Sequence, residues 1–221
     1  MKWPIDDATR AAARSFPLHI KAQQPKCQFS GRNFVYASWQ RHLRAQDKFP
    51  PRPATGYPTD PMQIISEFQA GHYLPGLALT VSWGNMARTK RHIYEDRPLQ
   101  RIHDTLDQCG KSIRKTESIS DSWNLLTDDL QWSSVITSKT LHFLCRALGF
   151  IQDAPVPIDH AGIRKKVWPL FRNRIPPEQR PGDWEGNSFE AYCRYMTAIL
   201  TWADARGWTT SQVETTIFDE N

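Results

Sequence analysis

Lys139 and Asp159 are the two residues of this 221-residue sequence whose types and spacing best fit covalent chemistry. An apolar pattern at helical spacing runs from near Thr137 to Gly149. It places Lys139 in the first turn of a helix that Thr137 or Ser138 can cap. The positive end of the helix macrodipole disfavours an ammonium there and eases the loss of its proton. A neutral amine beside a carboxylate is a pair suited to nucleophilic catalysis.

The chain between these two residues is long enough to bring them together. The expected helix is about 11 residues, or roughly 16 Å, long. The proline-containing stretch that follows can span up to about 30 Å, so it can return Asp159 to the start of the helix. Two simpler interpretations stay open. Asp159 precedes a helical pattern and can be an ordinary N-cap, and Lys139 can be a solvated surface lysine.

The hydrophobic spacing predicts a mostly α-helical protein, because the alternation typical of strands and the Asn-Gly or Asp-Gly turns of hairpins are both missing. The expected helical segments are an N-terminal arm before a Pro-rich crossing, 75–83, 98–109 with a stop at Cys109-Gly110, 137–148, 159–168 with Pro169 ending or kinking it, 187–206 closed by Gly207, and a last helix opened by a Thr209–Gln212 capping box.

The charge distribution favours a polyanionic partner. Residues 1–180 carry 26 basic and 16 acidic side chains, whereas residues 181–221 carry 2 and 7. No apolar run is long enough for a membrane span, and the N-terminus has no apolar leader pattern. The four scattered cysteines form no CxxC pair, so a reducing cytoplasm is expected. Phosphate-loop, dinucleotide-binding, serine-hydrolase and zinc-protease motifs are absent, so we expect no metal and no nucleotide cofactor.

The segment from Thr137 to Asp159 resembles the helix-hairpin-helix DNA glycosylases, specifically the 8-oxoguanine DNA glycosylase branch. In that family a lysine opens the helix after the hairpin, and an aspartate follows in a Pro-Val-Asp context, matched here by Pro157-Ile158-Asp159. Upstream, Asn85-Met86-Ala87-Arg88 resembles the family segment Asn-Ile-Ala-Arg, which contacts the base opposite the extruded one. The matches span residues 72–170 in the family's order.

Three positions depart from the family pattern. Ser133-Ser134-Val135-Ile136 stands where the family has a glycine-rich hairpin, whose amides reach a DNA phosphate. Trp83 or Gly84 replaces an asparagine that is common before the Asn-Ile-Ala-Arg segment. The family usually has a histidine two residues after the aspartate. Ala161 occupies that position here, and His160 lies one position earlier.

The resemblance implies a two-lobed helical fold with the active site in the cleft between the lobes. It divides the chain into an N-terminal arm and crossing (1–70), a core with the hairpin-like segment (71–175) and C-terminal helices that complete the base pocket (176–221). It implies that Lys139 attacks C1′ of an extruded nucleotide and forms a Schiff base, with strand cleavage by β-elimination, and that Asp159 stabilises the sugar cation.

The DNA contacts are expected from one group of basic, polar and aromatic residues around this pair. For the basic members a solvated helix face is the simpler interpretation, and for each tryptophan it is core packing. The expected contact residues are Trp83, Asn85, Arg88, Trp132, Ser138, His160, Lys165 and Trp202.

The expected substrate is double-stranded DNA with a damaged or modified base, and the expected active form is a monomer. The family prototype suggests 8-oxoguanine; another purine, or a hypermodified base such as those phages use, stays open, and with it a role in repair or in defence. Two other functions are also open. One is a non-catalytic DNA-binding module using residues 207–213 as a helix-turn-helix turn, and the other is a protein-interaction scaffold.

Overall fold

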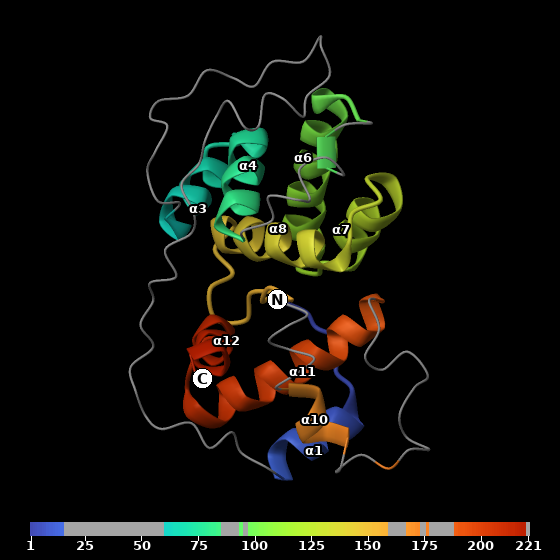
Figure 1. The fold of residues 1–221 in the computed structure, drawn as a ribbon, viewed down its shortest axis with the longest axis vertical. Coiled ribbons are helices and arrows are strands. Elements are labelled where there is room, and N and C mark those ends of the chain that lie inside the picture. Colours follow the sequence, from blue (N-terminus) through green and yellow to red (C-terminus); the bar gives the residue numbers. More distant parts are fainter. Residues whose placement is uncertain are drawn as a thin grey trace. The chain divides into compact units, whose positions relative to one another are not determined.

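The protein is helical throughout the part of the chain that its computed structural model describes, namely residues 1–15, 60–84, 93–94, 97–158, 167–172, 176 and 188–219. No strand occurs within these ranges, which confirms the expected mostly α class for them. The chain forms two compact units (Figure 1), one made of Met1–Gln28 with Phe150–Asn221 and the other of Phe29–Gly149. This division differs from the three consecutive segments expected, because both ends of the chain enter unit 1.

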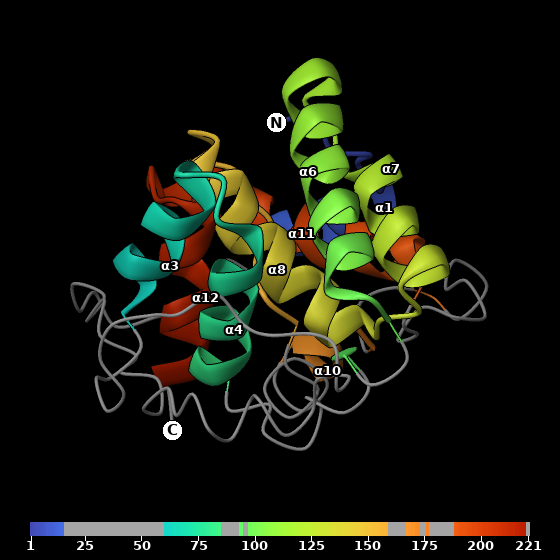
Figure 2. The same ribbon diagram turned by 90° about the horizontal axis from the view of Figure 1, so that it is seen from above.

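Unit 2 is built around helix α8, Ser134–Ala147, in which every residue from Ile136 to Cys145 is buried. The other helices of the unit pack against α8, as Figure 1 shows from the side and Figure 2 from above. These helices are α3 (Pro61–Gln69), α4 (Tyr73–Trp83), α6 (Leu99–Thr116), α7 (Ser120–Asn124) and the π-helix η2 (Leu125–Asp129) that continues α7.

Helix α4 begins as the sequence predicts, with Pro75 in its first turn, where the missing amide proton costs nothing. Its residues from Pro75 to Ser82 are all buried, so it packs on several sides rather than along one stripe. It ends at Trp83 with Gly84 as C-cap, and the Gly84 amide donates to the Thr80 carbonyl oxygen at 3.0 Å.

Helix α6 is longer than expected. Its stop was predicted at Cys109-Gly110, but the helix continues to Thr116 and ends at Glu117, whose φ of 55° is left-handed. Gly110 is an interior helical residue that faces α4: a β-carbon there would lie 3.4 Å from the Tyr73 hydroxyl oxygen. The Tyr73 side chain packs on Gly110 at an ordinary contact distance, and the prediction of a helix end at this residue is wrong.

Two interior glycines of unit 2 give a matched test of packing. A β-carbon at Gly76 would lie 3.0 Å from the Phe68 ring, whereas one at Gly110 meets ordinary contact distances. Alanine gains about 1 kcal/mol over glycine in a helix interior, and overpacking costs about 1–3 kcal/mol. We expect Gly110→Ala to keep or raise the free energy of unfolding and Gly76→Ala to lower it, as measured by urea denaturation. Equal effects of the two substitutions would contradict the packing described here.

Asp107 links α6 to α4. The Tyr73 hydroxyl donates to Oδ1 at 3.2 Å, and Lys111 Nζ lies 2.6 Å from Oδ2. The hydrogen bond from Lys111, with a further one from Tyr73, lowers the pKa of Asp107 below its ordinary value of 3.8. A lowered pKa in the folded state means that the pair stabilises the fold above pH 3.8 and loses this effect as the pH falls through the lowered value.

We therefore expect Asp107→Asn to reduce the free energy of unfolding near neutral pH by less than about 1 kcal/mol, because the ion pair is partly exposed to solvent. The difference from wild type should vanish in strongly acidic buffer, where both side chains are neutral. Urea denaturation over an acidic pH series measures this. A difference that persists at the acidic end would mean that Asp107 acts through packing instead of through its charge.

Unit 1 joins the N-terminal helix α1 (Asp7–Ser15) to the C-terminal part of the chain, as the blue and orange-red ribbons of Figure 1 show. Asp6 begins α1 by accepting from the Thr9 amide at 2.7 Å. The long helix α11 (Phe189–Arg206) carries the core, and α12 (Thr210–Asp219) follows it. Helix α10 (Trp168–Arg172) is short and has Pro169 as its second residue; most of the helix expected over 159–168 lies outside the described residues, so the expected effect of Pro169 on it stays a prediction.

Both ends of the turn between α11 and α12 follow the sequence prediction. Gly207 closes α11 in the left-handed conformation at φ 65°. Thr209 and Gln212 form the expected capping box: the Thr209 amide donates to the Gln212 side chain at 2.8 Å, and the Gln212 amide donates to the Thr209 hydroxyl at 3.1 Å. The predicted capping box is thus confirmed.

Candidate functional site

Lys139 lies in the second turn of α8, one turn later than expected. The helix begins at Ser134, because Ser133 has the extended N-cap conformation and its carbonyl accepts from the Thr137 amide at 3.0 Å. Ser138 is not a cap; its hydroxyl donates to the Val135 carbonyl oxygen at 3.2 Å, and the residue is fully buried. The field of a helix end decays within one turn, so the start of α8 does not account for a deprotonated Lys139.

The connection before α8 also differs from expectation. Residues 133–136, which stand at the position of the family's hairpin, form the N-cap and first turn of α8. The turn itself is Leu130–Ser133, with Gln131 in the left-handed region at φ 49°. Two serines before an apolar residue suit a turn and a helix start equally well, which explains the difference. Trp132 in this turn is 4% exposed, and its indole nitrogen has no hydrogen-bond partner among the described residues.

The end of helix α4 meets the Lys139 side chain. Lys139 is 7% exposed, and its Nζ donates a long hydrogen bond, 3.4 Å, to the carbonyl oxygen of Gly84. The same nitrogen lies 5.9 Å from the centre of the Trp83 ring. A helix C-terminus carries partial negative charge, so this carbonyl is a favourable partner for a cation. Trp83 and Lys139 were expected in one site, but the contact between them was not predicted.

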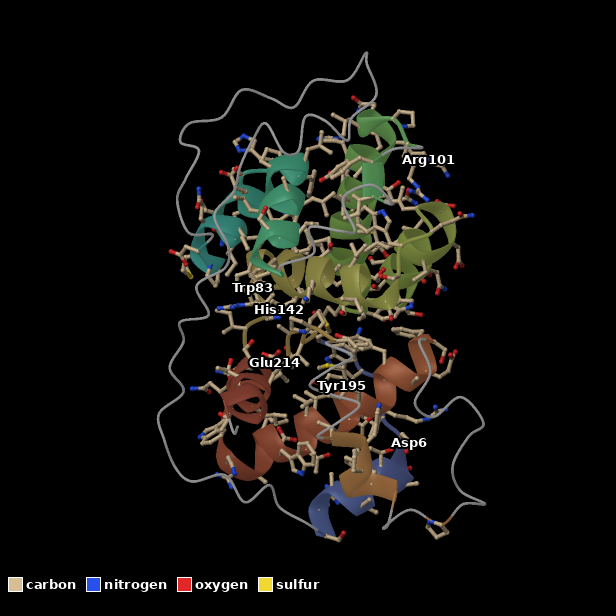
Figure 3. The ribbon with its side chains drawn as sticks, viewed as in Figure 1. Asp6, Trp83, Arg101, His142, Tyr195 and Glu214 are labelled. Carbon is tan, nitrogen blue, oxygen red and sulfur yellow. The ribbon has the colours of Figure 1, made fainter. Side chains whose placement is uncertain are left out.

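Aromatic side chains of α8 pack against Trp83 at the end of α4. Trp83 packs edge-to-face on Phe143, with centroids 5.0 Å apart and planes at 90°. Phe143 in turn packs edge-to-face against His142 at 4.8 Å. Figure 3 labels Trp83 and His142, which lie near each other at this end of unit 2. His142 was not among the predicted site residues; its position one turn after Lys139 on the same helix was the available signal.

Five of the predicted site residues lie outside the described residues: Asn85, Arg88, Asp159, His160 and Lys165. The chain positions of two of them are nevertheless informative. Asn85 directly follows Gly84, the residue that Lys139 contacts. The Lys139 amine therefore contacts the residue that directly precedes the Asn85–Arg88 segment, although Gly84 and Lys139 are 55 positions apart in the sequence.

The chain leading to Asp159 is anchored in unit 1. The Tyr192 hydroxyl donates to the Val156 carbonyl oxygen at 2.8 Å, and the Thr210 hydroxyl donates to the Ala154 carbonyl oxygen at 2.8 Å. The Val156 amide contacts the Met196 sulfur at 3.5 Å. Prolines 155 and 157 stiffen the same stretch. Contacts with α11 and α12 therefore fix the backbone at Ala154 and Val156, a few residues before Asp159.

Trp202, expected at the base pocket, is a core residue of unit 1. Its side chain is 2% exposed, its indole nitrogen donates to the Ala13 carbonyl oxygen at 3.2 Å, and its ring packs on Phe171 at 5.8 Å. The packing of α1 on α11 thus accounts for the burial of Trp202. Its base contact stays an untested prediction.

The positive charge of the protein is concentrated outside the described residues. The described residues include 13 lysines and arginines against 15 aspartates and glutamates, and the remaining segments hold 15 against 8. Among these segments, 85–92 begins directly after Gly84 and 159–166 directly after Ile158. The largest net charge among the remaining segments, +6, is on residues 16–59, so a contact with a polyanion would involve that segment as well as the two next to the predicted site.

The buried cysteines Cys109 and Cys193 are unsuited to act as nucleophiles. Burial raises the pKa of the Cys109 and Cys193 thiols to about 12, so they stay protonated near neutral pH. No group of three or more metal-ligating side chains occurs in the described ranges. The helices of those ranges include none with the length and apolar character that a bilayer crossing needs.

Comparison of the chain with protein-family models, with curated proteins and with solved structures gives no match.

Proposed function

We propose that the protein is a DNA glycosylase with lyase activity that extrudes a damaged or modified base from double-stranded DNA and excises it. The observation that carries this proposal is the contact between the Lys139 amine and the carbonyl of Gly84. It brings Lys139 to the residue that directly precedes Asn85–Arg88, the other segment on which the family resemblance depends. A buried lysine held at a second, independently recognised motif fits a functional role better than it fits a solvated surface residue.

The chemistry requires a nucleophilic amine at C1′ of the extruded nucleotide. In the proposed reaction the Lys139 nitrogen forms a bond to C1′ while the N-glycosidic bond breaks, and the base leaves with the bonding electron pair and takes up a proton. The amine passes its own proton to the Asp159 carboxylate. Opening of the sugar ring then gives a Schiff base between Lys139 and C1′.

Strand cleavage follows from the Schiff base. The imine acidifies the C2′ proton, and its removal breaks the bond between C3′ and its oxygen, so that the 3′ phosphate leaves. Hydrolysis of the imine returns the lysine. Asp159 also stabilises the positive charge that develops on the sugar as the base departs. The reaction therefore uses two side chains of this protein and water.

The expected DNA contacts come from the segments next to these two residues. In the proposed complex Asn85 and Arg88 contact the strand opposite the extruded base, and His160 and Lys165 contact phosphates near Asp159. The net charge of +3 on residues 85–92 and +2 on residues 159–166 suits these roles. The proposed substrate is DNA containing 8-oxoguanine, another modified purine, or a hypermodified base such as those phages use.

The described residues weaken the alternative of a helix-turn-helix module. Its recognition helix would be α12, which contains no lysine or arginine and carries Glu214. The hydroxyls of Thr215 and Thr216 donate to carbonyls of their own helix at 2.9 and 2.6 Å. Recognition helices present basic and amide side chains to DNA, so α12 is poorly suited to the major groove.

A panel of duplexes tests the proposed activity. Each duplex contains one modified purine, and unmodified and phage DNAs with hypermodified bases complete the panel. We expect released base, measured by mass spectrometry, and a matching alkali-labile site from at least one member, and from none of the unmodified duplexes. Binding of intact DNA without any released base across the panel would favour the non-catalytic module instead.

A further inference from the structure

Trp83 contributes to the proposed site in a way that the family resemblance does not supply. It is the last residue of α4, and the chain turns after it through Gly84. Its ring centre lies 5.9 Å from Lys139 Nζ, within the range of a cation–π interaction. The carbonyl of the next residue accepts from the same nitrogen at 3.4 Å. One helix end therefore provides two adjacent groups that attract a positive charge.

The Trp83 ring is held in this position by packing. It meets Phe143 of α8 edge-to-face, one helical turn beyond Lys139, with centroids 5.0 Å apart. Phe143 is fully buried. Lys139 is part of α8, and the Trp83 ring is held against Phe143 of the same helix. The distance between the ring and the amine is therefore set by packing on α8.

The two contacts favour the ammonium form of Lys139. The face of an indole ring attracts a cation, and a helix C-terminal carbonyl carries partial negative charge. Burial acts in the opposite direction, because it disfavours any charged group. The state of the amine therefore depends on both effects, and removing the attraction of the ring should shift the balance toward the neutral amine.

Several ionisable side chains on the surrounding helices contact other residues than Lys139. Helix α8 itself contributes His142, which packs on Phe143, and α4 contributes only Tyr73, which is bonded to Asp107. On the remaining helices of unit 2, Glu67 contacts His72, and Asp104, Asp121 and Asp128 accept hydrogen bonds from Gln100, Ser112 and Thr127. His103 pairs with Asp104 and Lys111 with Asp107. The other acidic and basic groups on these elements are Asp129, Arg101, Arg114, Lys115 and Arg146.

We propose that Trp83 is a positioning residue for Lys139: its ring and the Gly84 carbonyl hold the lysine as an ammonium at the end of α4 while DNA is absent. The amine must then leave this position and give up its proton before it can attack C1′. This last consequence rests on the proposed function, whereas the resting position does not. The competing role for Trp83 is stacking on the extruded base.

Fluorinated tryptophans test the proposal with little change in side-chain shape. Successive ring fluorines weaken the attraction of the indole face for a cation. The measurement is the titration of Lys139 in DNA-free protein, followed by the 13Cε shift of labelled lysine and assigned with Lys139→Arg. With mono-, di- and trifluorotryptophan incorporated only at position 83, the titration midpoint should fall stepwise, by about 0.5–1.5 pH units over the series.

The same series incorporated at Trp202 is the matched control, because that ring lies in the core of unit 1 against Phe171. It should leave the Lys139 midpoint unchanged. Two conventional substitutions extend the test: Trp83→Tyr should retain part of the effect, and Trp83→Leu should give the lowest midpoint.

A Lys139 midpoint that does not respond to fluorination at position 83 would overturn the proposal. If fluorination instead changes only the affinity for modified DNA, Trp83 stacks on the base. The test is independent of catalysis: a stepwise shift in a protein that releases no base would support the resting position of Lys139 and refute the glycosylase function.

Discussion

Substitution of Lys139 by glutamine is expected to abolish both base release and the covalent protein–DNA intermediate, while binding of modified DNA is retained. Glutamine is close to lysine in length but has no nucleophilic nitrogen, so no Schiff base can form. Single-turnover base release and binding to the same duplex, measured side by side, give the result. Loss of turnover should reach the detection limit, since the proposed pathway begins with this amine.

Lys111→Gln is the matched control. Lys111 is an exposed lysine of α6 that pairs with Asp107, so its loss should leave base release unchanged. Lys139→Arg keeps the positive charge at the end of α4 and should also be inactive, because the guanidinium is not a nucleophile at neutral pH. Retained activity in a folded Lys139→Gln protein would show that water, activated by Asp159, attacks the sugar.

Asp159→Asn should lower the rate of base release by roughly 10²–10³-fold with little change in DNA binding, because it removes a charge aimed at the developing sugar cation but keeps the shape of the side chain. If Asp159 only caps a helix, the same substitution should cost at most about 1 kcal/mol of stability and leave the rate near wild type, since asparagine also caps well. Single-turnover kinetics with a thermal denaturation curve separate the two roles.

The control for this substitution is Asp104→Asn, which changes an exposed carboxylate of α6. We expect it to leave base release unaltered. An Asp159→Asn protein that is folded, binds modified DNA and releases base at the wild-type rate would remove Asp159 from the mechanism and leave it with the capping role alone.

Local signals in the sequence were sufficient for the helix ends in unit 1. Gly207 and the pair Thr209 and Gln212 form a helix stop and a capping box whose partners lie within four residues, and both are present as predicted. The start of α4 near Pro75 is a signal of the same kind. Such ends depend on hydrogen bonds between neighbours in the chain, so a short sequence window contains all that is needed.

The predictions failed where distant segments decide the structure. Gly110 was interpreted as a helix stop, but it is an interior residue of α6, packed against the Tyr73 side chain of α4. Helix α8 begins at Ser134 with Ser133 as its N-cap, so Lys139 lies in the second turn. The helix macrodipole therefore does not favour loss of the Lys139 proton as expected. In each case the local residue type fits two structures, and packing against another helix selects one of them.

The same limit applies to the candidate site. The sequence placed Trp83 and Lys139 in one site because of a family resemblance, and it contained no information on the contact between Lys139 and Gly84. That contact arises because α4 ends against α8 and is visible only in three dimensions. The roles of Asn85, Arg88 and Asp159 stay predictions, because these residues lie outside the described ranges.

The most direct test of the proposed mechanism is borohydride trapping during turnover on the duplex whose base is released. Reduction of the Schiff base should yield a stable protein–DNA adduct, and peptide mass mapping should place the modification on Lys139. The adduct should be absent from Lys139→Gln and present in Lys111→Gln. Release of base without any trappable adduct, or an adduct on a residue other than Lys139, would contradict the account.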